Sequence, residues 1–172
     1  MESENKIYRE LKKRLTTDTY DHGQKLRAEV LREEFACSAS TVREILFRLA
    51  SEGFVHFQDQ RGFRMPELSP TKLIELTHMR ILLESEGAVL SIRQGGVGWE
   101  ASLTAAHHKL SHLEKRIHAR EDPTELVDLW FNSEKEFHQT LISACGSTTL
   151  KHMHSLIYAQ FRQQLMKADR RF

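Results

Sequence analysis

The stretch that decides the fold is SASTVREILFRLASEGFV, residues 38–55. Its apolar residues recur three or four positions apart, as on one face of an α-helix, at Val42, Ile45, Leu46 and Leu49. We predict a short helix here, with Ser40 or Thr41 as its cap and with Arg43 and Arg48 pointing away from the core. The helix stops at a glycine and runs into β-type sequence.

Two more helices are expected before this stretch. The first has one apolar face, formed by Ile7, Tyr8, Leu11 and Leu15. The second spans Leu26 to Phe35 and turns Val30, Leu31 and Phe35 inward.

Two short strands, residues 54–57 and 63–65, are expected after it, because the five residues between them, QDQRG, carry a hairpin signal. Three helices followed by a hairpin form a winged helix-turn-helix, in which the third helix enters the DNA major groove. We assign residues 1–66 to a domain of this kind.

The second half of the chain carries no strand pattern. Residues 67–70 are predicted to be an extended linker, since Pro66 precedes them and Pro70 is the last of them. Four helices are then expected, over about 71–94, 99–120, 123–144 and from 148 onward. The predicted fold is therefore mainly α, with a winged helix followed by an all-α antiparallel helical bundle over residues 71–172.

Composition narrows the class of protein. The formal charge of +1 over 172 residues excludes a uniformly basic nucleic-acid binder, so any DNA contact has to come from a local patch. Cys37 and Cys145 form no C-x-x-C pair, which is typical of a reducing compartment. The sequence shows no membrane-spanning run, signal peptide or catalytic motif, and we expect a cytoplasmic protein that is not an enzyme.

The first 66 residues resemble the DNA-binding domain of the GntR family of bacterial transcription regulators. The family pattern V-S-R-T-P-V-R-E-A-L is similar to CSASTVREIL at residues 37–46, and L-x-x-E-G-L-V is similar to LASEGFV at residues 49–55. The R-G that ends the family's wing stands here as Arg61-Gly62. Ala39 replaces the usual arginine, and that arginine's contact to guanine is worth about 1–3 kcal/mol of base discrimination.

The second half resembles the all-helical FadR-type domain of the same family. MRILLE at residues 79–84 is similar to the family's R-x-x-L-E pattern, and EKEFHQTL at 134–141, followed by Cys-Gly-Ser, is similar to D-x-x-F-H-x-x-L…G-N. The resemblance implies an effector-responsive regulator that binds operator DNA as a homodimer. Two histidines of the family's metal site fall beyond Phe172, so we expect an incomplete helical domain.

The predicted DNA contacts are Arg27, Ser38, Ser40, Thr41, Arg43, Arg48, Arg61 and Gly62. Arg43 stands on the first turn of the recognition helix, where side chains reach base edges and phosphates. The hydroxyls near the start of that helix suit a phosphate, and the wing suits the minor groove or the DNA backbone. The alternatives are a solvated surface arginine, plain helix caps and a surface turn.

The predicted effector site consists of Arg80, Glu134 and His138. Glu134 and His138 are four residues apart, so they share one helical face, and they fall on the family motif for a metal or an effector. They could ligate a divalent metal such as Zn, Ni or Mn, or Arg80 could pair with Glu134 or with the carboxylate of an organic acid. The alternative is a buried Glu–His–Arg cluster without a metal. His108 and His112 have the same spacing, but we expect them on a solvated face.

The function that this sequence favours is an effector-responsive repressor that binds a pseudo-palindromic operator in double-stranded DNA as a dimer. A second hypothesis is a small-molecule or metal-binding helical module that has lost specific DNA binding. The near-neutral charge and Ala39 favour the second, whereas Arg43 and Arg61-Gly62 favour the first.

Overall fold

The computed structural model describes residues 2–17, 19–119 and 124–165. By its internal contacts the chain divides into two compact units, one from residues 1–77 and 156–172 and the other from residues 78–155. Helices α4 (Pro70–Gln94) and α7 (Thr148–Leu165) each supply residues to both units. Among the described residues, no helix has both the length and the apolar composition needed to cross a membrane.

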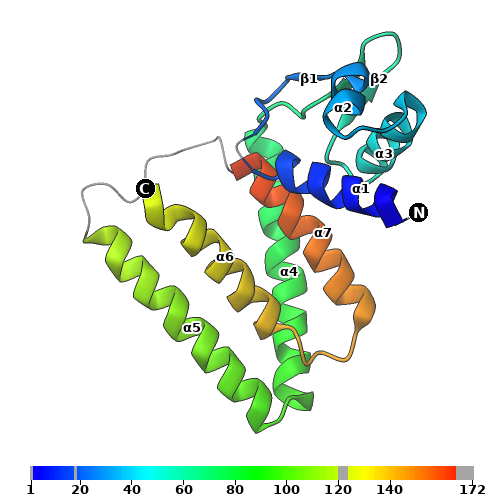
Figure 1. Cartoon of the computed structure of the whole chain (residues 1–172). Coiled ribbons are helices and arrows are strands. Elements are labelled where there is room, and N and C mark those ends of the chain that lie inside the picture. Colours follow the sequence, from blue (N-terminus) through cyan, green and yellow to red (C-terminus); the bar gives the residue numbers. More distant parts are fainter. Residues whose placement is uncertain (1, 18, 120–123, 166–172) are drawn as a thin grey trace. The chain divides into compact units, whose positions relative to one another are not determined.

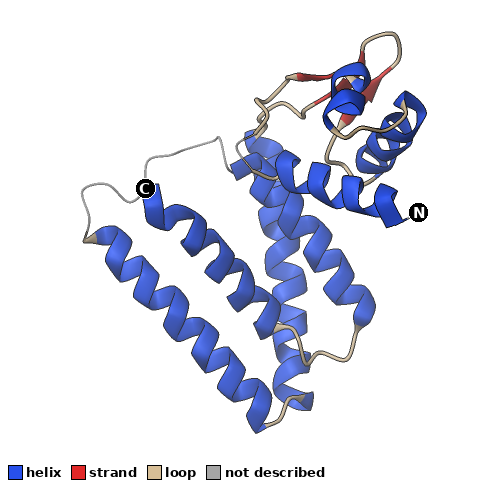
Figure 2. Ribbon diagram, viewed as in Figure 1, coloured by secondary structure: helices blue, strands red, loops and turns tan. Residues whose placement is uncertain are grey.

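The first unit has the element order of a winged helix (Figure 1). Besides the ends of α4 and α7, its elements are α1 (Glu2–Leu15), β1 (Lys25–Leu26), α2 (Ala28–Glu34), α3 (Ala39–Ser51), β2 (His56–Gln58) and β3 (Gly62–Arg64). Figure 2 shows the short strands of this unit among its helices. The mainly α fold with a winged helix is confirmed.

The sheet has three antiparallel strands in the order β1-β3-β2, one strand more than the predicted hairpin. Leu26 was expected to open the second helix, and this expectation is wrong: Leu26 lies in β1, where it pairs with Phe63 and is buried. Helix α2 therefore begins only after Arg27, whose backbone is extended. Val30 was expected to face inward, but 48% of its surface is exposed.

Helix α3 buries the apolar face that its sequence predicts. The side chains of Val42, Ile45, Leu46 and Leu49 are at most 2% exposed and pack in the core with α1 and the sheet. The predicted cap is wrong by two or three residues, because Ser38 is the N-cap and its Oγ accepts a hydrogen bond of 3.1 Å from the Thr41 amide. Ser40 and Thr41 instead lie in the first turn.

The end of α7 belongs to the winged-helix unit because of its glutamines. Gln163 is buried and donates from Nε2 to the carbonyl oxygens of Leu15 (3.1 Å) and Phe54 (2.9 Å). Gln164 accepts from the amide of Ser69 (3.0 Å) and donates to the carbonyl of Glu67 (3.2 Å). Two of the residues predicted as a linker, Glu67 and Ser69, are thus held by one side chain near the other end of the sequence.

The second unit contains the rest of α4, α5 (Val97–His118), α6 (Thr124–Leu141) and the first part of α7. Helices α5 and α6 pack along one another, with Ala106, Leu110 and Leu113 of α5 buried. Helix α4 approaches its neighbours closely at Gly87. A Cβ atom there would stand only 2.6 Å from Cγ2 of Ile142 and 3.1 Å from Cδ2 of Leu150.

The close approach at Gly87 gives a prediction about stability. Gly87→Ala is expected to lower the free energy of unfolding by about 1–3 kcal/mol, because the added methyl group overpacks a filled core. Urea denaturation measures the change. Gly98→Ala is the control, since no atom lies within 4 Å of its added Cβ and the substitution favours the helix. Equal stability of the two variants would show that the core at Gly87 is loose.

Candidate nucleic-acid interface and a buried polar cluster

A groove of about 480 Å³ lies between the start of α2, helix α3 and the β2–β3 hairpin. Its polar lining residues are Lys25, Arg27, Glu29, Arg43 and Gln60. Its apolar lining residues include Phe47, Phe57 and Phe63. The groove thus joins the recognition helix to the wing, the two parts of a winged helix that contact DNA.

Positive charge prevails in this groove, with Lys25, Arg27 and Arg43 against the single carboxylate of Glu29. The side chain of Arg43 is 60% exposed, and its Nη2 lies 3.6 Å from Oε1 of Glu29. Such an exposed ion pair is worth at most about 1 kcal/mol, so a phosphate or a base edge can replace Glu29 as the partner of Arg43.

Hydroxyl groups gather at the N-terminus of α3. Oγ of Ser38 lies 2.8 Å from Oγ of Ser40 and 2.9 Å from Oγ1 of Thr41, and all three form one small hydrogen-bonded group. Free backbone amides and the helix dipole favour an anion at such an end. This arrangement suits a DNA phosphate, and the capping by Ser38 is compatible with it.

The wing residues occupy different positions. Arg61 is exposed in the turn between β2 and β3, and its amide donates to the carbonyl of Gln58 (3.1 Å). Gly62 is the first residue of β3, lines the groove and has a φ of +75°, a backbone conformation that favours glycine. The sequence interpretation missed Lys25, because β1 is too short to have a pattern of its own. It also missed Gln60, because the hairpin signal of residues 58–62 predicts the turn but not which of its side chains lines a groove.

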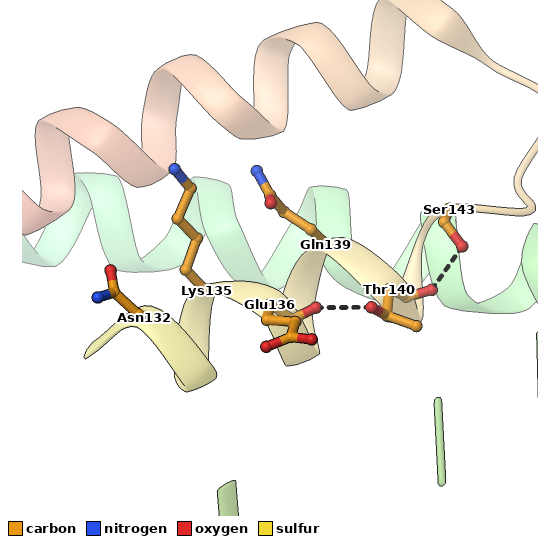
Figure 3. Close-up of a pocket in the computed structure, with 6 residues that line it drawn as sticks. All are labelled: Asn132, Lys135, Glu136, Gln139, Thr140 and Ser143. Carbon is orange, nitrogen blue, oxygen red and sulfur yellow. Dashed lines mark hydrogen bonds between the residues drawn. The ribbon is translucent and has the colours of Figure 1, made fainter. Parts of the chain in front are cut away.

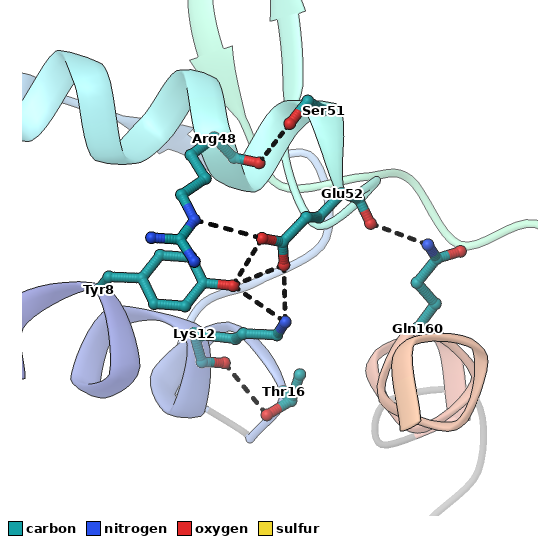
Figure 4. A network of polar contacts seen from close by, with 7 residues as sticks. All are labelled: Tyr8, Lys12, Thr16, Arg48, Ser51, Glu52 and Gln160. Carbon is teal, nitrogen blue, oxygen red and sulfur yellow. Dashed lines mark hydrogen bonds and ion pairs between the residues drawn. The ribbon is translucent and has the colours of Figure 1, made fainter. Parts of the chain in front are cut away.

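Arg48 lies outside the groove, in a network that joins α1 to the end of α3 (Figure 4). Its guanidinium carbon stands 3.9 Å from the centre of the Tyr8 ring, and its Nε lies 3.5 Å from Oε1 of Glu52. Tyr8 and Lys12 both donate hydrogen bonds to the Glu52 carboxylate (2.7 and 2.6 Å). Burial raises the pKa of Glu52, but these bonds outweigh it and the net pKa is lowered. The contacts of Arg48 therefore indicate that it holds the winged helix together.

A second polar cluster is buried in the unit of residues 78–155. The Arg80 side chain donates to Oε1 of Glu84 (3.1 Å) and, through Nη2, to Oε1 of Glu134 (2.9 Å). His138 bridges the same two carboxylates, with Nδ1 2.9 Å from Glu84 and Nε2 3.2 Å from Glu134. His154 is 1% exposed, and its Nε2 lies 2.9 Å from Oε1 of Glu84. The three residues predicted as an effector site are thus brought together.

The charges in this cluster compensate each other. Burial alone would lower the pKa of His138, but its bonds to Glu134 and Glu84 outweigh burial and raise the pKa from 6.5 to about 9. Burial likewise opposes ionisation of Glu84, whereas His138, His154 and Arg80 hold the pKa of that carboxyl well below its usual range. At neutral pH two cations therefore face two carboxylates.

The charged groups of this cluster have partners in one another. In the part of the chain that the structure describes, no three His, Cys, Asp or Glu side chains are grouped so as to hold a metal ion. Arg80 and His138 together balance the two carboxylates of Glu84 and Glu134, and a divalent metal at Glu134 and His138 stays a prediction. His108 and His112 lie on the exposed surface of α5, as expected.

Two members of the cluster were missed by the sequence interpretation. Glu84 is four residues after Arg80, the spacing of an ion pair on one helical face, and this signal was present in the sequence. His154 had no such signal, because its partner lies on α4, distant in sequence.

A shallow hollow on the exposed face of α6 is separate from the cluster (Figure 3). It is lined by Asn132, Lys135, Glu136, Gln139, Thr140 and Ser143. The hydroxyls of Thr140 and Ser143 donate to the backbone carbonyls of Glu136 (2.7 Å) and Thr140 (2.9 Å). The two hydroxyls are therefore engaged locally, and none of the lining residues belongs to the buried cluster.

A recognition helix beside a small antiparallel sheet, with cations in the groove between them and helices following, defines a winged-helix transcription regulator. Residues 3–65 match the bacterial regulatory proteins of the gntR family, and residues 75–171 match the FCD domain. The chain belongs to the GntR family of regulators, in the group that carries an FCD domain.

Several known proteins are similar to this chain. An uncharacterized HTH-type transcriptional regulator, BphR of Paraburkholderia xenovorans, is 35% identical over 82% of the chain, which spans 57% of that protein. The HTH-type transcriptional repressor GlaR of Escherichia coli is 30% identical over 88% of the chain, which spans 67% of GlaR. The chain thus spans 57% of the length of one relative and 67% of the length of the other.

Two solved structures share the fold. Escherichia coli McbR/YncC superposes with a TM-score of 0.71 at 20% identity, covering 95% of this chain and 74% of that one. A GntR regulator from Rhodococcus sp. RHA1 superposes with a TM-score of 0.74 at 17% identity, covering 100% and 79%.

The raised pKa of His138 gives a prediction about pH. A group whose folded pKa is raised stabilises the protein fully below its unfolded pKa of 6.5, and this stability is lost as the pH rises through about 9. His138→Gln is therefore expected to lower the unfolding free energy by on the order of 2 kcal/mol near pH 6 and by much less near pH 10. Urea denaturation across this pH range measures the change in unfolding free energy. His108→Gln is the control, because His108 is exposed. A difference that does not change with pH would contradict the ion-paired imidazolium.

Proposed function

We propose that the chain is the operator-binding and effector-sensing part of a bacterial transcriptional repressor. The observation that carries this proposal is the groove, where three cations and the start of α3 surround one concave surface. The sequence as a whole has a charge of only +1, so this local excess is where a phosphate backbone is attracted. The printed name of GlaR, a repressor, supports the direction of regulation.

A single recognition helix reads only one half-site, so specific binding requires a second copy of the chain. A homodimer on a pseudo-palindromic operator in double-stranded DNA meets this requirement. Arg27 and Arg43 contact phosphates or base edges, the hydroxyls at the start of α3 contact phosphate, and Arg61 with Gly62 contact the DNA beside the wing. Such a protein works on the chromosome, in the bacterial cytoplasm.

The buried cluster supplies the effector site in this proposal. Arg80 is only 8% exposed and is held by two carboxylates of its own chain. The carboxylate of an organic acid has the same chemistry as Glu134 and exchanges with it on Arg80, next to His138. This exchange breaks the ion pair by which Arg80 of α4 holds Glu134 of α6. A coupling free energy of about 1–3 kcal/mol between effector binding and DNA binding changes operator affinity about 5–150-fold.

The test of DNA binding is selection of genomic fragments by the purified protein. We expect enrichment of one short palindrome, and Arg43→Ala is expected to weaken binding to it by about tenfold or more, because a base or phosphate contact is lost. Arg93→Ala is the control, since it removes the same charge from an exposed position of α4. Affinity should also fall steeply between about 50 and about 200 mM salt.

Two outcomes would contradict this proposal. Equal binding by the Arg43→Ala and Arg93→Ala variants would show that the groove does not contact DNA. Absence of any enriched sequence would favour the second function, a helical small-molecule module that has lost specific DNA binding.

The effector is tested by thermal denaturation with a panel of carboxylic acids. A true effector raises Tm with its concentration, because it binds the folded state alone. Glu134→Gln is expected to increase its affinity, since the internal competitor for Arg80 is neutralised. Glu136→Gln is the control, because Glu136 pairs with Lys109 on the exposed surface. An acid that stabilises wild type and both variants equally binds elsewhere and would overturn this assignment.

A further inference from the structure

Two phenylalanines in the groove are half exposed. Phe47 of α3 is 49% exposed and Phe57 of β2 is 46% exposed, although both are large apolar side chains. Phe47 stands one helical turn after Arg43, on the same outward face of α3. Phe57 comes from the wing and lines the same groove as Arg27 and Arg43. The recognition helix and the wing therefore each contribute one half-exposed phenyl ring to the groove that is also lined by Lys25, Arg27 and Arg43.

These two rings pack against each other and against Phe63. The ring centres of Phe47 and Phe57 are 4.8 Å apart, and each lies 4.9 Å from the centre of Phe63. Phe63 is buried and is paired with Phe57 across the sheet. The interplanar angles of 45–76° are those of tilted and edge-to-face packing, which favours a fixed arrangement. Phe63 anchors the group in the core, while the outer faces of the other two rings remain available.

We propose that Phe47 and Phe57 form an apolar platform that reads the 5-methyl group of thymine in the operator. The inference rests on the proposed operator binding and names the base specificity of that same groove. Thymine is the base that carries an apolar group on the major-groove edge, and a phenyl side chain is one of its recognised partners.

The position of the rings among cations supports this assignment. Contacts from Arg27, Arg43 and Lys25 to phosphates position a protein on DNA but carry no base information directly. Ala39 lacks the side chain with which a guanine can be read at the start of α3. Beside any base-edge contact of Arg43, the exposed apolar surface in the groove is then a part of this face that can distinguish one base pair from another.

The experiment uses the operator obtained by selection and replaces its thymines by uracil one at a time, which removes a single methyl group. We expect wild type to lose about fourfold in affinity at one or more positions of each half-site, the effect of one buried methyl group. In Phe47→Gln this loss should disappear at the same positions, so that the variant binds thymine and uracil operators equally. Phe57→Thr, which replaces the ring by a β-branched residue that also favours a strand, is the second variant if Phe47→Gln does not fold.

Val30→Gln is the matched control, because Val30 is an apolar residue of α2 with 48% exposure that does not line the groove. This variant should keep the full difference in affinity between the thymine operator and the uracil operators. An operator in which every thymine can be replaced without loss overturns this inference and leaves the proposed operator binding intact. A selection that enriches no sequence overturns both, and a uracil effect that persists in both phenylalanine variants assigns the methyl contact to another residue.

Discussion

The burial of one face of α3 is the constraint on which the DNA-binding unit depends. Four apolar side chains, from Val42 to Leu49, reach into the core and fix the rotation of the helix about its axis. Arg43 and Phe47 face outward because no rotation that keeps the core closed can turn them inward. Gly53, with a φ of +78°, then reverses the chain, and the fully buried Phe54 fixes where the wing starts. The chemistry of the groove is therefore a consequence of packing on its opposite side.

The chain uses charge in two opposite ways. In the buried cluster, Arg80 and His138 are matched by Glu84 and Glu134, which is necessary because an unpaired ion in an apolar interior is costly. In the groove, three cations face one carboxylate, and the excess positive charge is stabilised by contact with water. A matched cluster holds helices together, whereas an unmatched surface attracts a partner of opposite charge.

The periodic parts of this fold could be predicted from the sequence. The apolar faces of α1 and α3 and the four later helices follow from helical spacing, and Glu134 and His138 were correctly placed on one face because four residues make about one turn. The errors have a common physical cause. Strand β1 has only two residues, too few for a period, and it exists because Leu26 pairs with Phe63. His154 joins Glu84, and Phe47 meets Phe57, through contacts between residues distant in sequence, which no local pattern encodes.

The boundary of the winged-helix unit likewise depends on contacts between distant residues that the sequence pattern does not reveal. Proline and a change of periodicity suggest a domain that ends at residue 66, yet the carbonyls of Leu15 and Phe54 take their hydrogen bonds from Gln163, near the end of α7. Leu15 is the last residue of α1, so its carbonyl has no partner within the helix and would be costly to bury without one. Glu52 is held in the same way through its carbonyl by Gln160. The winged helix is thus completed by side-chain amides late in the chain, which donate to backbone carbonyls that its own elements leave without a partner.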